Sequence, residues 1–424
     1  MALKISQQRE DSKFLAKPRE GLKEPPNPEE WKQVYRISLM DNELHSLLEA
    51  LDCCDLVTLL LQRNKNLVAI PEFFFTSICH LRVLDLHGLP TDIEALKQLE
   101  VLDIRGTKLS LYQIRTLTWL KSLRMSLSNF GRGSQTQNQS GNVSSFVSLE
   151  EFSIDIDSSL RWWAGNGNII AEEVATLKKL TSLQFCFTTV HCLEFFVSSS
   201  PAWKDFFVST SPAWEDLSFT FQFAVGYQNL TCFQILESFE YPGYNCLKFI
   251  NGEGINPVIS KVLAKTHAFG LINHKGVSRL SDFGIKNMND LFICSIEGCN
   301  EIETIINGTG ITKNVFEYLH HLHIKNVLKL ESIWQGPVYA GSSTLLRILV
   351  LLRCPQLKKI FSNGMIQQFS KLEDLRVEEC DKIEEIIMKS ENNGLESNQL
   401  PRLKTLTLLN LPRLRSIWVD DSLE

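Results

Sequence analysis

Apolar residues recur along the chain in the pattern L-x-x-L-x-L-x-x-(N/C/T), where x is any residue. In the N-terminal part, copies begin at Val34, Leu56, Leu81, Leu99, Leu120, Leu149 and Leu180, and the last two are weaker. A longer form, L-x-x-L-x-L-x-x-C-x-x-L-x-x-I, begins at Leu291, Leu319, Leu346, Leu372 and Leu403, at steps of 28, 27, 26 and 31 residues. Self-similarity at such a period predicts a repeat architecture.

The central L-x-L of each copy predicts a short strand, because successive residues of a strand point to opposite faces. The leucines then point into the coil and the residues between them point outward. One coil cannot bury its apolar side alone, so neighbouring coils must stack and share one core. We therefore expect an α/β solenoid with a parallel β-sheet on its concave side and an irregular or short-helical convex side.

The position just after each predicted strand holds a small side chain. It is occupied by Asn42, Asn64, Thr107, Cys299, Cys354 and Cys380. A polar group there can bond to backbone groups where the chain turns. For the three cysteines, a metal or redox role competes with a structural role in which a small, weakly polar group fills the slot, and we favour the structural one.

Two segments depart from the pattern. Residues 131–145, GRGSQTQNQSGNVSS, lack apolar side chains to pack and predict a flexible loop. Residues 195–205 are repeated almost unchanged at 206–216. Eleven residues are too few for a coil, so we interpret 195–216 as a surface insertion with one copy packed and the other exposed. Residues 217–280 show strand-like fragments without a clean register, which favours irregular repeats.

Charge and composition restrict the classes of partner. Lys and Arg total 43 against 49 Asp and Glu, for a net charge of −6, so the chain lacks the excess of cations that binds nucleic acid. No apolar run is long enough to span a bilayer, and the N-terminus becomes charged before a secretory signal could form. The 11 cysteines include no C-x-x-C pair, so we expect a soluble, cytoplasmic protein with reduced thiols.

Catalytic signatures are missing from the sequence. It contains no phosphate-binding G-x-x-x-x-G-K-[ST], no G-x-S-x-G, no H-E-x-x-H and no kinase motif. We therefore predict neither an enzyme nor a cofactor. His321 and His323 share a predicted strand face and suggest a metal site, but no third ligand is evident, and polar residues on a solvated strand face are the simpler interpretation.

Outward-facing strand positions are the candidate binding residues, because stacking arranges them in columns on the concave face. Mixed charge around an apolar patch is typical of protein recognition. The candidates are Asp85, His87, Asp103, Arg105, Arg124, His321, His323, Lys325, Ile348, Val350, Leu352, Asp374, Arg376 and Glu378.

Several stretches resemble a known family. WKQVYRISLMDN, LVTLLLQRN and LRVLDLHG are similar to the entry into the leucine-rich repeats of plant coiled-coil NB-LRR disease-resistance proteins, and RCPQLKKIF and ECDKIEEII are similar to their C-terminal repeats. The resemblance implies a leucine-rich-repeat horseshoe. Residues 1–33 would be a remnant joining a nucleotide-binding module to the repeats, followed by N-terminal repeats at 34–194, irregular repeats at 195–280 and regular repeats at 281–424.

The resemblance also implies a role in defence. Repeats of this group sense a pathogen effector, or a host protein that an effector has modified, and hold the nucleotide-binding module inactive. The coiled coil, the phosphate-binding loop and the M-H-D motif of the family are not found in this sequence, so nucleotide switching is not implied. An alternative is the substrate-recognition array of a ubiquitin-ligase adaptor, although residues 1–33 are short and proline-rich for an F-box-like helical segment.

Overall fold

The computed structural model describes residues 14–418, apart from 33, 50–52, 54, 68–69, 72–73, 87–92, 94–95, 108–110, 128–142, 157–160, 209–217, 227–244, 312, 362–364 and 388–399. The chain divides into two compact units. Among the described residues, the first unit contains 14–188 and 194–206, and the second contains 189–193, 207–226 and 245–418.

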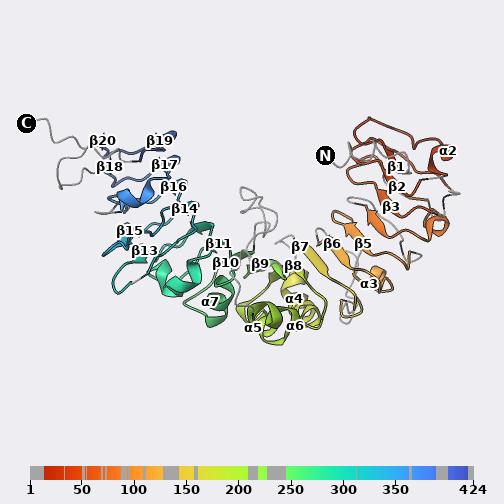
Figure 1. Cartoon of the computed structure of the whole chain (residues 1–424), viewed down its shortest axis with the longest axis horizontal. Coiled ribbons are helices and arrows are strands. Elements are labelled where there is room, and N and C mark those ends of the chain that lie inside the picture. Colours follow the sequence, from red (N-terminus) through yellow and green to blue (C-terminus); the bar gives the residue numbers. More distant parts are fainter. Residues whose placement is uncertain are drawn as a thin grey trace, which may run out of the picture. The chain divides into compact units, whose positions relative to one another are not determined.

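The first unit is built on eight parallel strands that pair in chain order (Figure 1). They are β1 (Phe14–Ala16), β2 (Arg36–Ser38), β3 (Thr58–Leu60), β4 (Val83–Asp85), β5 (Val101–Ile104), β6 (Ser122–Leu127), β7 (Glu151–Ile156) and β8 (Ser182–Phe187). Each strand pairs with the next repeat, as the sequence period predicts.

The inward positions of the repeats form columns. Leu59, Leu84, Leu102 and Leu123 are directly paired in register, and each is fully buried. Burying a leucine side chain contributes roughly 1.5–3 kcal/mol, so the columns supply much of the stacking energy. The predicted solenoid and its strand register are confirmed.

A left-handed residue turns the chain after many of the strands. Asp41, Arg63 and Asn326 have φ values of 55°, 63° and 53° at this position, and Gly226 has a φ of 96°. A Cβ on Gly226 would lie 2.0 Å from the carbonyl oxygen of Ile250, so this turn requires glycine. After Asp41 and Arg63, the turn places Asn42 and Asn64 where their side chains donate to the carbonyls of Leu39 and Leu61.

Helical segments lie along one side of the strands of the first unit (Figure 1). They are α2 (Pro28–Trp31), the 3₁₀ turn η1 (Phe75–Ile78), α3 (Leu111–Ile114) and α4 (Arg161–Ala175). Asn27 caps α2 by accepting from the N–H of Glu29, and the buried Trp31 packs edge-on against Phe74. In α4, Trp163 packs on Phe185 of β8 and donates its indole N–H to the carbonyl of Cys186.

The first copy of the duplicated segment is packed, as expected for one of the two copies. It completes α5 (Val190–Ser199) and begins α6 (Pro201–Val208), and Phe196 and Trp203 within it are fully buried. Phe196 packs against Phe187 of β8, and Trp203 packs against Phe196, so this copy contributes to the core. Most of the second copy, from 209 on, lies outside the described residues.

The predicted loop at 131–145 lies outside the described residues up to 142. Val143, at its end, is buried, and its N–H donates to the Glu173 carboxylate at 2.9 Å. The chain is thus anchored to α4 where the description resumes.

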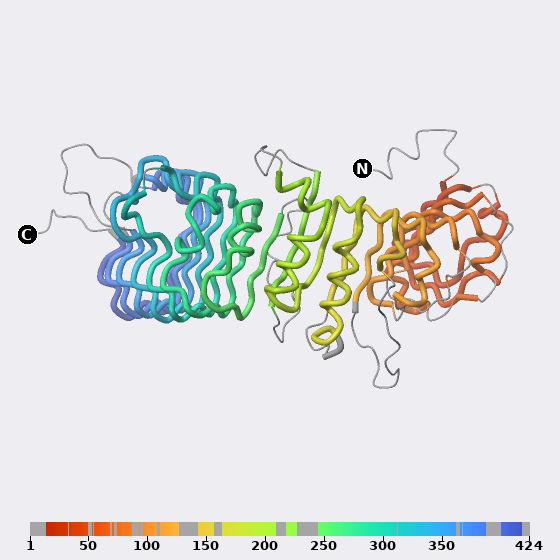
Figure 2. Tube along the Cα trace, turned by 90° about the horizontal axis from the view of Figure 1, so that it is seen from below, coloured from red at the N-terminus to blue at the C-terminus, as the bar shows by residue number. Residues whose placement is uncertain are grey.

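The second unit also contains eight parallel strands that pair in chain order. They are β9 (Thr220–Val225), β10 (Cys246–Ile250), β11 (Ala268–Ile272), β12 (Ile293–Glu297), β14 (His321–Lys325), β16 (Ile348–Leu352), β17 (Asp374–Glu378) and β19 (Thr405–Leu409). Figure 2 shows the stacked coils in line, from green to blue.

Shorter elements connect these strands. Two parallel pairs form small second sheets, β13 (Thr304–Asn307) with β15 (Ser332–Gln335) and β18 (Glu385–Ile387) with β20 (Ser416–Trp418). The helical elements are α7 (Pro257–Leu263) and the 3₁₀ turns η3 (Leu280–Phe283), η4 (Ile285–Met288) and η5 (Ile366–Phe369). Among the described residues, the side of the second unit away from its main sheet is thus mostly irregular and includes the short helix α7.

Strands β10 and β11 explain why the sequence pattern faded between 217 and 280. They pair in register over five residues, and every residue of both is buried. A strand that is buried on both faces loses the alternation of apolar and polar residues. Strands β10 and β11 thus pair in register although their sequences do not alternate.

Candidate functional site

The outward side chains of the main-sheet strands in each unit form a surface that we call the open face. Each candidate residue within the described part of the chain lies there, on β4 to β6 in the first unit or on β14, β16 and β17 in the second, with Arg105 just after β5. His87 lies outside the described residues.

Nine candidates of the second unit form a grid, because β14, β16 and β17 pair without a shift. The three rows across these strands are His321, Ile348 and Asp374; His323, Val350 and Arg376; and Lys325, Leu352 and Glu378. Residues 26 or 27 positions apart in the sequence are thus brought side by side.

The centre of this grid is apolar. Ile348, Val350 and Leu352 all point outward from β16 and are partly exposed, whereas Leu349 and Leu351 between them are fully buried. We call the three outward residues the β16 patch. Apolar side chains left open to solvent on a sheet face supply binding energy when a partner covers them.

Histidines border the β16 patch on β14. The rings of His321 and His323 stack with centroids 6.3 Å apart. Burial lowers the pKa of His321, and burial together with the nearby Lys325 lowers the pKa of His323 to about 4. His323 is therefore neutral at pH 7. Among the described side chains, no group of three or more His, Cys, Asp or Glu residues is placed to hold a metal ion.

Charged residues border the patch on β17. Arg376 donates to the carboxylate of Glu378, two residues along the same strand face, and this contact raises the pKa of Arg376. Glu378 is only 8% exposed although the alternation places it outward. The arginine covers its carboxylate, so the charge stays paired in the free protein.

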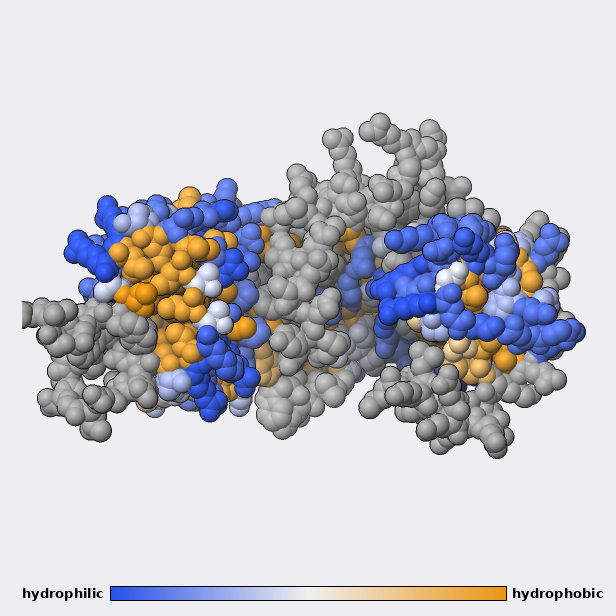
Figure 3. Space-filling view, turned by 90° about the horizontal axis from the view of Figure 1, so that it is seen from above, coloured by the Kyte–Doolittle hydropathy of each residue, from blue (hydrophilic) through white to orange (hydrophobic). Residues whose placement is uncertain are grey.

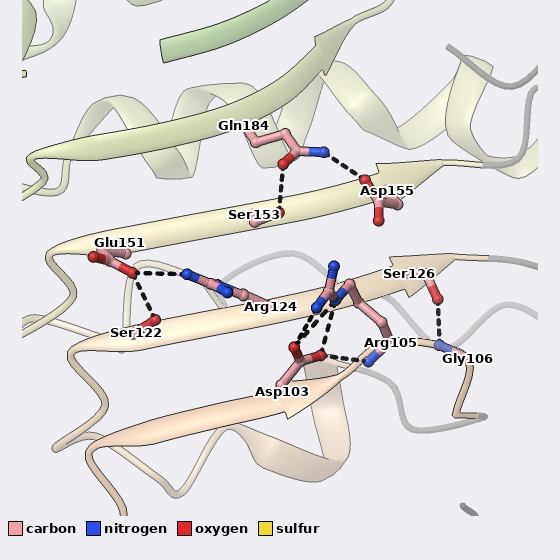
Figure 4. Close-up of polar contacts among 10 residues, drawn as sticks. All are labelled: Asp103, Arg105, Gly106, Ser122, Arg124, Ser126, Glu151, Ser153, Asp155 and Gln184. Atoms are coloured by element: carbon pink, nitrogen blue, oxygen red, sulfur yellow. Dashed lines mark hydrogen bonds and ion pairs between the residues drawn. The ribbon is translucent and has the colours of Figure 1, made fainter. Parts of the chain in front are cut away.

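The first unit contains the same arrangement. Arg105 donates to both carboxylate oxygens of Asp103, with Nη2 2.6 Å from Oδ2, and the hydrogen bond to Asp103 raises the pKa of Arg105 (Figure 4). Asp103 is 7% exposed. Sequence alternation predicted the face of Asp103 and Glu378 correctly, but it did not reveal that an arginine two positions away buries each of them.

Further polar contacts cover the open face of the first unit (Figure 4). Glu151 accepts from Ser122 at 3.0 Å and lies 3.6 Å from Arg124. Gln184 accepts from Ser153 and donates to Asp155. These contacts run between adjacent strands, and of these residues only Arg124 was among the sequence candidates. These polar side chains already bond to one another. A partner therefore gains less by contacting this face than by covering the apolar β16 patch.

Comparison with known proteins shows which repeats this chain resembles. Residues 318–424 match the family model described as plant disease resistance protein RPS2-like, leucine-rich repeats. The chain is 40% identical to disease resistance protein RFL1 of Arabidopsis thaliana over 112 residues, 24% of this chain and 13% of that protein. It is 25% identical to probable disease resistance protein At4g27220 of Arabidopsis thaliana over 98% of this chain and 47% of that protein.

Residues 318–424 thus match leucine-rich repeats of the plant disease resistance type. The aligned region spans less than half the length of these relatives, and 45% of a third, probable disease resistance protein At1g61300 of Arabidopsis thaliana, which is 26% identical. Among solved structures, the functional domain of InlJ from Listeria monocytogenes aligns at a TM-score of 0.46 and 12% identity over 93% of this chain and 79% of that chain. No helix in the described ranges is long and apolar enough to cross a membrane.

Proposed function

We propose that these disease resistance repeats are a protein-recognition domain of a plant intracellular immune receptor and act in the cytoplasm. The open face of the second unit binds a pathogen effector, or a host protein that an effector has modified. The observation that carries this proposal is the β16 patch, an apolar centre bordered by the histidines of β14 and by the charged residues of β17.

The arrangement suits selective binding of a protein. The partly exposed Ile348, Val350 and Leu352 supply apolar contact area, while Lys325 and Asp374 at opposite corners of the grid fix the orientation of the partner. Arg376 and Glu378 enter the interface already paired, so docking there does not leave a single charge buried.

We further propose that the repeats hold a nucleotide-binding module of such a receptor inactive. A ligand shifts a two-state switch only by the difference in its affinity for the two states. An effector that binds the open face more tightly when the module is released would therefore shift the module to its active state. The repeats supply the recognition, and the nucleotide chemistry belongs to the module.

Capture from pathogen-challenged plant tissue tests the recognition role. The wild-type chain, the variant Val350→Asn/Leu352→Asn and the control Val83→Asn/Val101→Asn are compared as baits. Val83 and Val101 are partly exposed outward residues on the open face of the first unit, so the control makes the same chemical change away from the β16 patch.

We expect a defined protein to be captured by the wild type and the control and lost with the β16 variant. Its purified form should then bind the wild-type chain about tenfold or more tightly than the variant. Equal capture by all three baits would contradict the proposal. Capture of ubiquitin-ligase core subunits would instead favour the adaptor alternative.

The autoinhibitory role has its own test. Purified repeats are added to the nucleotide-binding module of a related receptor, and the rate of ADP release is measured. Slower release with the repeats, reversed by the captured partner, supports the role. An unchanged rate contradicts it without affecting the recognition proposal.

A further inference from the structure

The small sheets of the second unit are separated by a repeat that joins neither of them as a strand. β13 pairs with β15, and β18 pairs with β20. Between these pairs in the chain lies the repeat of β16, and in the described ranges its contact with a small sheet is one bridge, from Lys359 to Glu385 of β18. No pairing of described residues joins this repeat to β15. A gap therefore separates β15 from residues 358–360.

A cavity of about 250 Å³ occupies this gap. Residues 331–334 form one side of its lining, and residues 358–360 form the other. For comparison, an apolar cavity of roughly 150 Å³ holds a benzene ring. The space between the two repeats is therefore large enough for one ring with a short chain attached.

The wall of the cavity includes apolar side chains that are firmly held. Trp334 and Ile360 are only 3% and 1% exposed. The Trp334 indole N–H donates to the carbonyl of Pro337 at 3.0 Å, so this polar group is already bonded. The Ser332 hydroxyl likewise lies 3.0 Å from that of Thr304. A ligand in the cavity thus meets mainly carbon surface on these side chains.

Two lysines contribute positive charge to the lining. Lys358 and Lys359 are exposed, and neither makes an ion pair with a described side chain. Glu331 supplies one carboxylate to the same lining, so one cation is in excess. Lysine can lay its methylene groups along apolar surface while its ammonium group stays in water. The arrangement therefore favours a ligand that carries a negative charge.

Apolar surface by itself does not single out a site on this protein. Apolar side chains are visible in orange on both units (Figure 3), as on most protein surfaces. The cavity differs from these areas because it is set between two repeats and has two lysines beside its apolar wall.

We infer that the cavity binds a small carboxylate in which a short chain joins the acid to one apolar ring. The ring packs between Trp334 and Ile360, and the carboxylate accepts hydrogen bonds from Lys358 and Lys359. A ring without a charge would leave both ammonium groups without an anion, and a carboxylate without a ring would leave the apolar wall uncovered. The inference does not depend on the proposed role of the β16 patch.

Hydrocinnamate, a phenyl ring joined by two methylene groups to a carboxylate, is a direct probe of the full chain. Saturation-transfer NMR titration measures its affinity. Hydrocinnamyl alcohol keeps the ring without the charge, and propionate keeps the charge without the ring. We expect each of these two compounds to bind at least about fivefold more weakly than hydrocinnamate.

Lysine variants of the chain locate the binding. Lys358→Gln/Lys359→Gln removes both charges, and Lys275→Gln/Lys286→Gln makes the same change at two exposed lysines elsewhere in the second unit. We expect hydrocinnamate to bind at least about fivefold more weakly to the first variant and unchanged, within about twofold, to the second.

A further variant fills the cavity. Ile360→Phe adds carbon atoms where the ring of the ligand would lie, so it should abolish the binding of hydrocinnamate. Ile305 is the equivalent residue two repeats earlier and is fully buried, so Ile305→Phe is the matched control and should bind as the wild type does. Thermal unfolding is measured first. If a phenylalanine variant fails to fold, the lysine variants decide the outcome, since they change only exposed side chains.

Several results would overturn the inference. They are no saturable binding of hydrocinnamate, equal binding of hydrocinnamyl alcohol, equal losses in the two lysine variants, and undiminished binding to folded Ile360→Phe. A peptide that ends in phenylalanine presents the same ring and carboxylate, so the peptide GSGSF is titrated beside its C-terminal amide. If GSGSF bound about tenfold more tightly than hydrocinnamate and its amide did not bind, the ligand would be the C-terminus of a protein rather than a small molecule.

Discussion

Asn42 and Asn64, in consecutive repeats, donate their side-chain amides to the same carbonyl oxygen, that of Leu39, at 3.0 and 2.9 Å. Each amide also donates to a second carbonyl, of Lys17 for Asn42 and of Leu61 for Asn64. Both asparagines are almost fully buried. Their amides therefore link neighbouring turns in a continuous ladder.

This ladder gives a quantitative prediction. Asn64→Ala should lower the free energy of unfolding by about 1–3 kcal/mol, because it leaves buried carbonyls with fewer donors. The double variant Asn42→Ala/Asn64→Ala should not show additive losses, since the two amides share one acceptor. Urea unfolding of the four proteins in the cycle measures the coupling, and strict additivity would argue against the shared bond.

Strand register can be tested at adjacent positions of β17. Leu375→Ala removes a fully buried side chain and should cost about 2–5 kcal/mol. Arg376→Ala removes an exposed side chain that pairs with Glu378 and should cost about 1 kcal/mol or less. Thermal or urea unfolding distinguishes the two, and similar losses at both positions would contradict the register.

Burial of His323 predicts a pH dependence of stability. Its pKa is lowered from 6.5 to about 4 in the folded protein, so the unfolded chain binds this proton more readily. The stabilisation from neutral His323 is complete above pH 6.5 and is lost as the pH falls towards 4. His323→Gln should therefore lose less stability than the wild type between pH 7 and pH 4.5, as measured by urea unfolding.

Thiol reactivity should follow burial. Cys79 is exposed, whereas burial raises the pKa of Cys294 to about 12 and that of Cys299 to about 11. The thiolate is the reactive form, so iodoacetamide at pH 8 should alkylate Cys79 quickly and the other two only after unfolding. Mass spectrometry of peptides at timed intervals follows each site. Rapid alkylation of Cys299 in the folded chain would conflict with its buried slot.

The sequence pattern alone was enough to predict the strand register of the repeats whose leucines are clearly spaced. Leu84 and Leu375 are inward and buried as predicted, and the slot residues Asn42 and Asn64 bond to backbone carbonyls as expected. Cys299 behaves likewise, with its sulfur within hydrogen-bonding distance of the carbonyls of Leu271 and Glu297. These features depend on local periodicity, which a single sequence carries.

Features that depend on neighbouring elements were not predictable in the same way. Lys248 on β10 is 1% exposed although it occupies an outward position, because the alternation is lost where both faces of a strand are covered. The first copy of the duplicated segment packs as helix against Phe187, which an eleven-residue period did not indicate. The burial of Asp103 depends on which way Arg105 folds back over it.

The separation of inward and outward positions along β16 affects how such a protein can change over time. Leu349 and Leu351 maintain the stack, while Ile348, Val350 and Leu352 form no part of the core beneath them. Substitutions at the three outward sites can therefore accumulate without loss of folding, so a lineage can acquire new specificities by altering a few codons in one strand. Selection would therefore constrain Leu349 and Leu351 strictly and the three outward positions only weakly.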